Sequence, residues 1–111
     1  MNMLTRYFYS RFTSMYNLNQ HLHFVGIGGV GMAAIAEVLH NLGYSISGSD
    51  LKKGILVKHL EDLGIPVSLG HAAANVPEST TTLVYSSAVQ KDNPEVQQAV
   101  AQDIPVIRRA E

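Results

Sequence analysis

The chain has 111 residues, of which 46% are hydrophobic and only 15% are charged, so we expect one globular domain with a substantial core. Its formal net charge of -1 lacks the basic excess of nucleic-acid-binding surfaces, and no apolar run approaches the roughly 20 residues that span a bilayer. The absence of cysteine excludes disulfides and cysteine-based metal sites, and it suits a cytoplasmic protein.

The first 20 residues differ in composition from the rest of the chain. They carry Arg6 and Arg11, several Ser, Thr and Tyr, and no acidic residue. We expect residues 1–20 to form a flexible N-terminal extension. An organelle transit peptide has a similar composition, and this alternative stays open.

A strand and a helix are expected next. Residues 21–27 predict a strand, because apolar residues dominate and glycines follow. Apolar residues then recur at i, i+3, i+4 and i+7, which predicts a helix with one face toward the core and an end at Gly43. This apolar stripe consists of Ile35, Val38, Leu39 and Leu42.

The same alternation continues to the end of the chain. A leucine stripe predicts a second helix that ends at Gly64, and residues 70–77 predict a loop. Asn93 predicts the cap of a third helix, with Pro94 at its first position and Glu95 near the positive end of its dipole. The inner face of this helix is expected at Val96, Ala99 and Val100.

Further strands are expected at residues 44–48, 65–69, 81–85 and 104–107. Pro105 predicts that the last of these strands lies at an edge of the sheet.

Strands that alternate with helices predict an α/β fold. We expect a Rossmann-like, doubly wound parallel sheet of about five strands in a single domain, with helices on both faces. In such sheets, ligands bind beyond the carboxyl ends of the strands, where the strand order reverses. The strand ends are therefore the places in which to look for a site.

The run GIGGVG at residues 26–31 lies between the first strand and the first helix. Glycine permits a sharp turn, and without side chains the turn lets a diphosphate approach backbone N–H groups at the helix N-terminus. The spacing G-x-G-x-x-G is weak evidence alone, but its place between strand and helix is the required context. A tight turn without a ligand is the alternative.

Polar residues follow the other strands. Asp50 ends the second strand, where a carboxylate accepts hydrogen bonds from ribose hydroxyls in dinucleotide folds. His71 and Asn75 follow the third strand and are candidates for contacts to a base or sugar, with an ordinary loop as the alternative. Ser86 and Ser87 at the end of the fourth strand are further candidates, with an ordinary polar strand end as the alternative. Arg108 and Arg109 after the fifth strand are the last candidates, with a solvated basic pair as the alternative.

Several kinds of chemistry have no support in the sequence. There is no G-x-x-x-x-G-K-[ST] loop for ATP, no G-x-S-x-G motif and no cluster with metal-ligand spacing. We therefore expect no catalytic and no metal-binding residue, and the residues predict a domain that binds a diphosphate and a ribose. An NAD-binding regulatory module and a domain that keeps the fold without binding are the alternative functions.

Several separated motifs resemble the N-terminal part of the UDP-N-acetylmuramate–L-alanine ligases of the Mur ligase family. The resemblance extends from about residue 21 to the last residue. The motifs are HFVGIGGVGM at residues 23–32, IAEVL at 35–39, GY at 43–44, GSD at 48–50, SSAV at 86–89, DNPE at 92–95 and IPVIRRAE at 104–111.

The resemblance implies a cytoplasmic enzyme of peptidoglycan synthesis. The family joins L-alanine to UDP-N-acetylmuramate with ATP and magnesium, through an acyl phosphate. Residues 21–111 would be the domain that binds the UDP-sugar, with no cofactor of its own and no catalysis in isolation. ATP, magnesium and L-alanine would bind to domains that this chain lacks.

The resemblance also assigns roles to residues. The glycine turn would hold the diphosphate, Asp50 the ribose and His71 the uridine. Residues 72–74 are alanines where relatives often have polar residues, which departs from the family pattern. The implied substrate-binding residues are Gly28, Gly29, Val30, Gly31, Asp50, His71, Ser87, Ala88 and, toward the anionic end of the ligand, Arg109.

Overall fold

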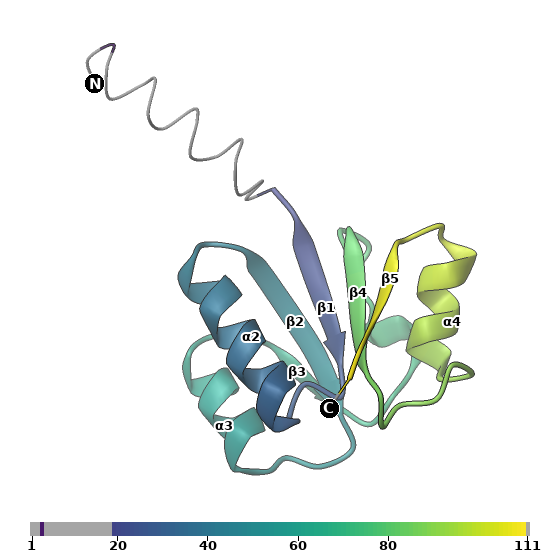
Figure 1. The fold of residues 1–111 in the computed structure, drawn as a ribbon, viewed down its shortest axis with the longest axis horizontal. Coiled ribbons are helices and arrows are strands. Elements are labelled where there is room, and N and C mark those ends of the chain that lie inside the picture. Colours follow the sequence, from purple (N-terminus) through teal and green to yellow (C-terminus); the bar gives the residue numbers. More distant parts are fainter. Residues whose placement is uncertain (1–2, 4–18, 111) are drawn as a thin grey trace.

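The computed structural model describes residue 3 and residues 19–110, so most of the extension expected at residues 1–20 lies outside the described residues. The described part forms a parallel sheet between helices (Figure 1). Its elements are β1 (His21–Val25), α2 (Val30–Asn41), β2 (Ser45–Asp50), α3 (Ile55–Asp62), β3 (Val67–Leu69), the short 3-10 helix η1 (Ala73–Asn75), β4 (Thr82–Ser86), α4 (Pro94–Ala101) and β5 (Val106–Arg109).

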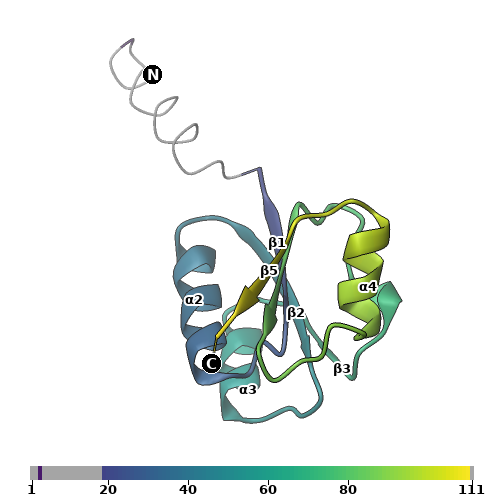
Figure 2. The ribbon, with the colours of Figure 1, turned by 45° about the vertical axis from the view of Figure 1, so that its right-hand side comes forward.

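The sheet has the order β3-β2-β1-β4-β5, and every neighbouring pair is parallel. The chain runs outward from β1 to β3 and then returns to β4 on the other side of β1. Helices α2 and α3 cover one face of the sheet, and α4 covers the other (Figures 1 and 2). The predicted Rossmann-like fold is confirmed, and the strand order reverses between β1 and β4.

The sheet separates two apolar clusters. Phe24 of β1 belongs to the cluster under α2 and α3, whereas its neighbour Val25 belongs to the cluster under α4. Both side chains are fully buried. Successive side chains of a strand point to opposite faces, so β1 has a core on each side, as the central strand of a doubly wound sheet requires.

The expected inner face of the first helix was partly wrong. Val38 is 57% exposed and Leu42 is 37% exposed, whereas Ile35 and Leu39 pack against the core. The face of α2 that packs on the sheet includes the small residues Ala33 and Ala36, which let the helix backbone approach the sheet. Val38 lies on the opposite side of the helix and faces outward. The buried residues of this helix are Met32, Ala33 and Ala36.

Two further predictions about local structure need correction. Val100 of α4 is 56% exposed, although Val96 and Ala99 are buried as expected. Residues 70–77, expected to be a loop, contain η1, whose turn is closed by the hydrogen bond from Val76 N–H to the carbonyl of Ala73.

The expected helix ends and sheet edge are confirmed. Gly43 and Gly64 follow α2 and α3 with φ of 101° and 98°, a backbone conformation that favours glycine. Strand β5, which follows Pro105, lies at an edge of the sheet. Among the described residues, no helix combines the length and the apolar character needed to cross a membrane.

Candidate functional site

The glycine turn between β1 and α2 is anchored to the end of β2. The N–H groups of Gly26 and Ile27 donate to the carbonyl of Ser49, at 2.9 and 3.1 Å. Gly26 has a φ of 80°, so this position favours glycine. Gly29 is the N-cap of α2 and has no side chain that could occupy the helix N-terminus. The turn therefore directs the first N–H groups of α2 toward the carboxyl ends of the strands.

Asp50 is attached to the same turn. Its Oδ2 accepts a hydrogen bond of 2.7 Å from the N–H of Gly28, and its Oδ1 accepts one of 2.7 Å from the N–H of Leu51. A carboxylate has about four lone-pair positions, so each oxygen retains capacity for a further donor. Asp50 thus fixes the turn and remains available to hydroxyl groups of a ligand.

A pocket of about 300 Å³ opens at this point, between the glycine turn, the ends of β2 and β4 and the loop after β3. It contains many of the residues expected at the site. Its lining consists of Gly26, Gly28, Gly29, Asp50, Leu51, His71, Ser86, Ala88 and Val89.

A second hollow of about 300 Å³ adjoins the first and shares Gly28 and Asp50 with it. It runs along the N-terminus of α3, and Lys52 adds a cationic side chain to its wall. Together the two hollows form an elongated surface that passes over the glycine turn.

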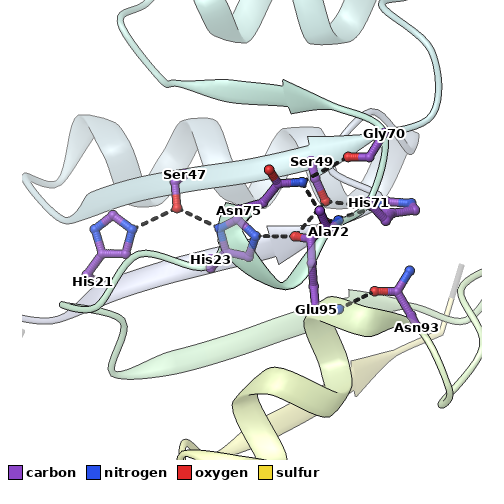
Figure 3. A network of polar contacts seen from close by, with 10 residues as sticks. All are labelled: His21, His23, Ser47, Ser49, Gly70, His71, Ala72, Asn75, Asn93 and Glu95. Carbon is purple, nitrogen blue, oxygen red and sulfur yellow. Dashed lines mark hydrogen bonds and ion pairs between the residues drawn. The ribbon is translucent and has the colours of Figure 1, made fainter.

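His71 connects the pocket to a buried carboxylate. Its side chain is 13% exposed, and its Nδ1 lies 3.1 Å from Oε2 of Glu95 and 2.9 Å from Oγ of Ser49. Glu95 is fully buried at the start of α4, and its Oε1 also accepts from Ser49 Oγ at 2.9 Å. On Oε2 it accepts from the N–H of Ala72 at 3.2 Å and from Nδ2 of Asn75 at 3.1 Å (Figure 3).

The polar network continues along β1 and β2. His23 is fully buried, and its Nε2 lies 2.6 Å from Oε1 of Glu95. Ser47 Oγ lies 2.7 Å both from His23 Nδ1 and from Nε2 of His21 (Figure 3). Hydrogen bonds therefore run without a break from His21 to His71, across the face of the sheet that α4 covers.

Two groups in this network have shifted protonation equilibria. Burial acts to raise the pKa of Glu95, but hydrogen bonds from His23, Asn75 and Ser49 and the charge of His23 outweigh it and hold the pKa below 4.5. Burial, together with the charge of His23, lowers the pKa of His21 below 6.5. Glu95 is consequently a carboxylate at neutral pH, and an acceptor for the groups around it.

Other expected site residues do not line this pocket. Val30 is 78% exposed at the start of α2, next to Gly31. Ser87 donates its N–H to the carbonyl of Arg109 at 2.9 Å. Arg109 lines a separate, largely apolar pocket between α2 and β5. Asn75 belongs to the Glu95 network rather than to the pocket lining.

The sequence interpretation missed the central role of Glu95. It predicted only that Glu95 lies near the positive end of the dipole of its helix. A signal was present in the two neighbouring strands. His21 and His23 in β1, and Ser45, Ser47 and Ser49 in β2, alternate with apolar or glycine residues. They are paired in register as His21↔Ser45 and His23↔Ser47. Alternation places them on one face, and a polar row in strands that are otherwise buried requires a polar partner.

These features define a class of protein: a Rossmann-like domain with a glycine-turn pocket at the switch point of its sheet. The comparisons with known proteins then identify the family. Residues 21–111 match the Mur ligase family, under the description "Mur ligase family, catalytic domain". The chain belongs to the Mur ligase family.

Two curated relatives, both named UDP-N-acetylmuramate–L-alanine ligase, illustrate the similarity. The UDP-N-acetylmuramate–L-alanine ligase of Rhodospirillum rubrum is 60% identical over 90 residues, which are 81% of this chain and 18% of that protein. The ligase of the same name from Desulfotalea psychrophila is 56% identical over 97 residues, which are 87% of this chain and 21% of that protein. The chain thus spans about a fifth of the length of these relatives.

Solved structures agree with this assignment. The UDP-N-acetylmuramate–alanine ligase of Thermotoga maritima superposes with a TM-score of 0.77 at 35% identity, over 80% of this chain and 20% of that one. A ligase from Neisseria meningitides, named for UDP-N-acetylmuramate and a tripeptide, gives a TM-score of 0.72 at 30% identity, over 80% and 28% of the two chains. A shikimate dehydrogenase from Aquifex aeolicus, at 13% identity and a TM-score of 0.52, shares the fold alone.

Proposed function

We propose that the glycine-turn pocket binds UDP-N-acetylmuramate, and that the chain supplies this site to a cytoplasmic ligase that joins L-alanine to that sugar in peptidoglycan synthesis. One observation carries the proposal. The pocket at the switch point is lined by the glycine turn, Asp50 and His71 together, three features that the sequence places far apart. The names of the relatives support the identity of the sugar nucleotide.

The chemistry of the ligand fits the parts of the pocket. A diphosphate suits the N–H groups of the glycine turn and the helix N-terminus at Gly28, Gly29, Val30 and Gly31. Ribose hydroxyls suit the carboxylate of Asp50, and the uridine suits His71. Ser87 and Ala88 are proposed to lie beside the diphosphate or the sugar, and Arg109 toward the anionic end of the ligand.

ATP, magnesium and L-alanine belong to the proposed reaction, but the described residues form no cluster of side chains for a metal ion. Among residues 19–110 no group of three or more His, Asp or Glu side chains is arranged to hold a metal ion. The chain contains no phosphate loop with a lysine. We therefore propose that these residues bind and orient the sugar nucleotide. ATP, magnesium and L-alanine are proposed to bind to other parts of the ligase.

A titration of the ¹⁵N-labelled chain with UDP-N-acetylmuramate tests the proposal. We expect the amide signals of residues 28–32 and of Asp50 to move, and UDP alone to compete for the same site. The Asp50→Ala variant should bind roughly tenfold more weakly, because it loses hydrogen bonds to a charged group. Gly29→Val should abolish binding by steric exclusion while the chain stays folded.

The outcomes separate the proposal from its alternatives. Unmoved amide signals at saturating UDP-N-acetylmuramate would exclude binding at this pocket. Tighter binding of NADH, with displacement of the UDP-sugar, would instead indicate an NAD-binding module. Unchanged titrations of both variants would indicate a domain that keeps the fold without using this site.

A further inference from the structure

His71 lies between two different environments, the glycine-turn pocket and a buried carboxylate. The side chain of His71 lines the glycine-turn pocket. Its Nδ1 lies 3.1 Å from Oε2 of Glu95 and 2.9 Å from Oγ of Ser49. The ring therefore connects the pocket with a carboxylate that is itself fully buried.

The neighbours of Glu95 determine which ring nitrogen carries the hydrogen. Oε2 also accepts hydrogen bonds from the N–H of Ala72 and from Nδ2 of Asn75, and both of these groups can only donate. The amide of Asn75 is itself oriented, because Nδ2 also donates to the carbonyl of Gly70 at 3.0 Å. Oε2 is consequently an acceptor, so Nδ1 of His71 is the donor. In the neutral ring the lone pair then lies on Nε2.

We propose that Glu95 is a positioning residue for ligand binding, which fixes His71 in the Nδ1–H tautomer so that Nε2 accepts a hydrogen bond from an N–H or O–H group of the UDP-sugar. This proposal rests on the proposed function, because the UDP-sugar supplies the donor. The N–H of the uracil ring and the sugar hydroxyls are donors of this kind. Without the carboxylate, the ring is free to take the other tautomer, which presents a hydrogen where the ligand also has one.

The cost of burying Glu95 supports a role beyond packing. A buried carboxylate loses its hydration, and apolar residues of similar size often stabilise a core as well or better. Here the carboxylate accepts from five groups on three different segments: β1, β2 and the loop after β3. The arrangement therefore orients the loop that carries His71 with respect to the glycine turn.

Long-range ¹H–¹⁵N spectra of the histidine rings test the proposal directly. At neutral pH we expect His71 to show a protonated Nδ1 and an unprotonated Nε2, and UDP-N-acetylmuramate to shift Nε2 more than Nδ1. A protonated Nε2 in the free chain would overturn the proposal. So would an unshifted His71 ring while the amides of residues 28–32 move, a result that leaves the proposed function intact. Unmoved amides would instead contradict the proposed function itself.

The Glu95→Gln variant provides a signature that a purely structural role does not predict. Its amide oxygen should take the place of Oε2, because Ala72 and Asn75 can only donate. Its amide nitrogen should then face Nε2 of His23 and Oγ of Ser49, and both of these atoms can become acceptors. We expect His23 to change its protonation pattern, His71 to keep its tautomer, and the variant to recover most of the affinity that Glu95→Ala loses. A changed His71 tautomer with unchanged affinity would contradict the proposal.

Two further variants keep the test decisive. In His71→Asn the side-chain amide can still donate to Glu95 but has no atom in the place of Nε2, so we expect a folded chain that binds about tenfold more weakly. Glu95→Ala should weaken binding by a similar factor and mix the His71 tautomers. Wild-type affinity in His71→Asn, or in folded Glu95→Ala, would overturn the proposal; if Glu95→Ala does not fold, His71→Asn and the tautomer measurement decide.

Discussion

At Gly28 the backbone of the glycine turn passes very close to two side chains. A Cβ atom built on this residue would lie 2.8 Å from Oδ2 of Asp50 and 2.9 Å from Cγ2 of Val57. Asp50 cannot move away without losing its hydrogen bond from the N–H of Gly28. We therefore expect Gly28→Ala to lower the free energy of unfolding by about 1–3 kcal/mol, as overpacking does, and to weaken UDP-N-acetylmuramate binding. Urea unfolding and ligand titration measure the two effects.

Gly54 provides the matched control at the same scale. It borders the adjoining hollow, but a Cβ at this position meets no atom within 4 Å, and its backbone is extended. Gly54→Ala should therefore cost less, since only the preference of the α3 N-cap for glycine over alanine is lost. Equal losses in the two variants would show that the contact at Gly28 is not the cause.

At the scale of elements, Asn93 caps the N-terminus of α4, and this cap also helps to position Glu95. The side chain of Asn93 accepts a hydrogen bond of 2.9 Å from the N–H of Glu95. We expect Asn93→Ala to destabilise the chain by about 1 kcal/mol, whereas Asn93→Ser retains a side-chain acceptor and most of that stability. Thermal or urea unfolding distinguishes them, and a serine variant as unstable as the alanine variant would contradict a capping role.

The elements also show what the sequence can and cannot predict. The capped start of α4, the glycine ends of α2 and α3, and the alternation of strands with helices followed from local signals, because turn and cap residues act within a few positions. The outward positions of Val38 and Val100 did not follow, because they depend on how each helix is rotated against the sheet. At the site, glycine spacing and the residues at strand ends predicted the pocket lining at Gly28, Asp50 and His71.

The role of Glu95 was beyond such local signals. Its partners lie on β1, β2 and the loop after β3, between 20 and 72 positions away along the chain. No periodicity within one segment predicts a contact of this kind. Only the strand register, together with the way α4 crosses the sheet, brings the carboxylate beside the histidines.

At the scale of the whole molecule, the network from His21 to Glu95 makes stability depend on pH. The pKa of His21 is lowered in the folded chain by burial and by the charge of His23. As pH falls below 6.5, His21 is therefore protonated more readily in the unfolded chain than in the folded chain, and stability decreases. The pKa of Glu95 is also lowered in the folded chain: burial opposes the shift, and hydrogen bonds and the charge of His23 produce it. Its contribution is present above pH 4.5 and is lost as pH falls through its folded value.

Both shifts act in the same direction, so we expect the urea midpoint to fall from pH 7.5 to pH 5.5 and to fall further by pH 3.5. The first decrease reports His21, and the second reports Glu95 together with the other carboxylates. His21→Gln should reduce the first decrease, because its side chain does not titrate in this range. A midpoint at pH 5.5 as high as that at pH 7.5, or an equal first decrease in His21→Gln, would show that His21 does not carry this dependence.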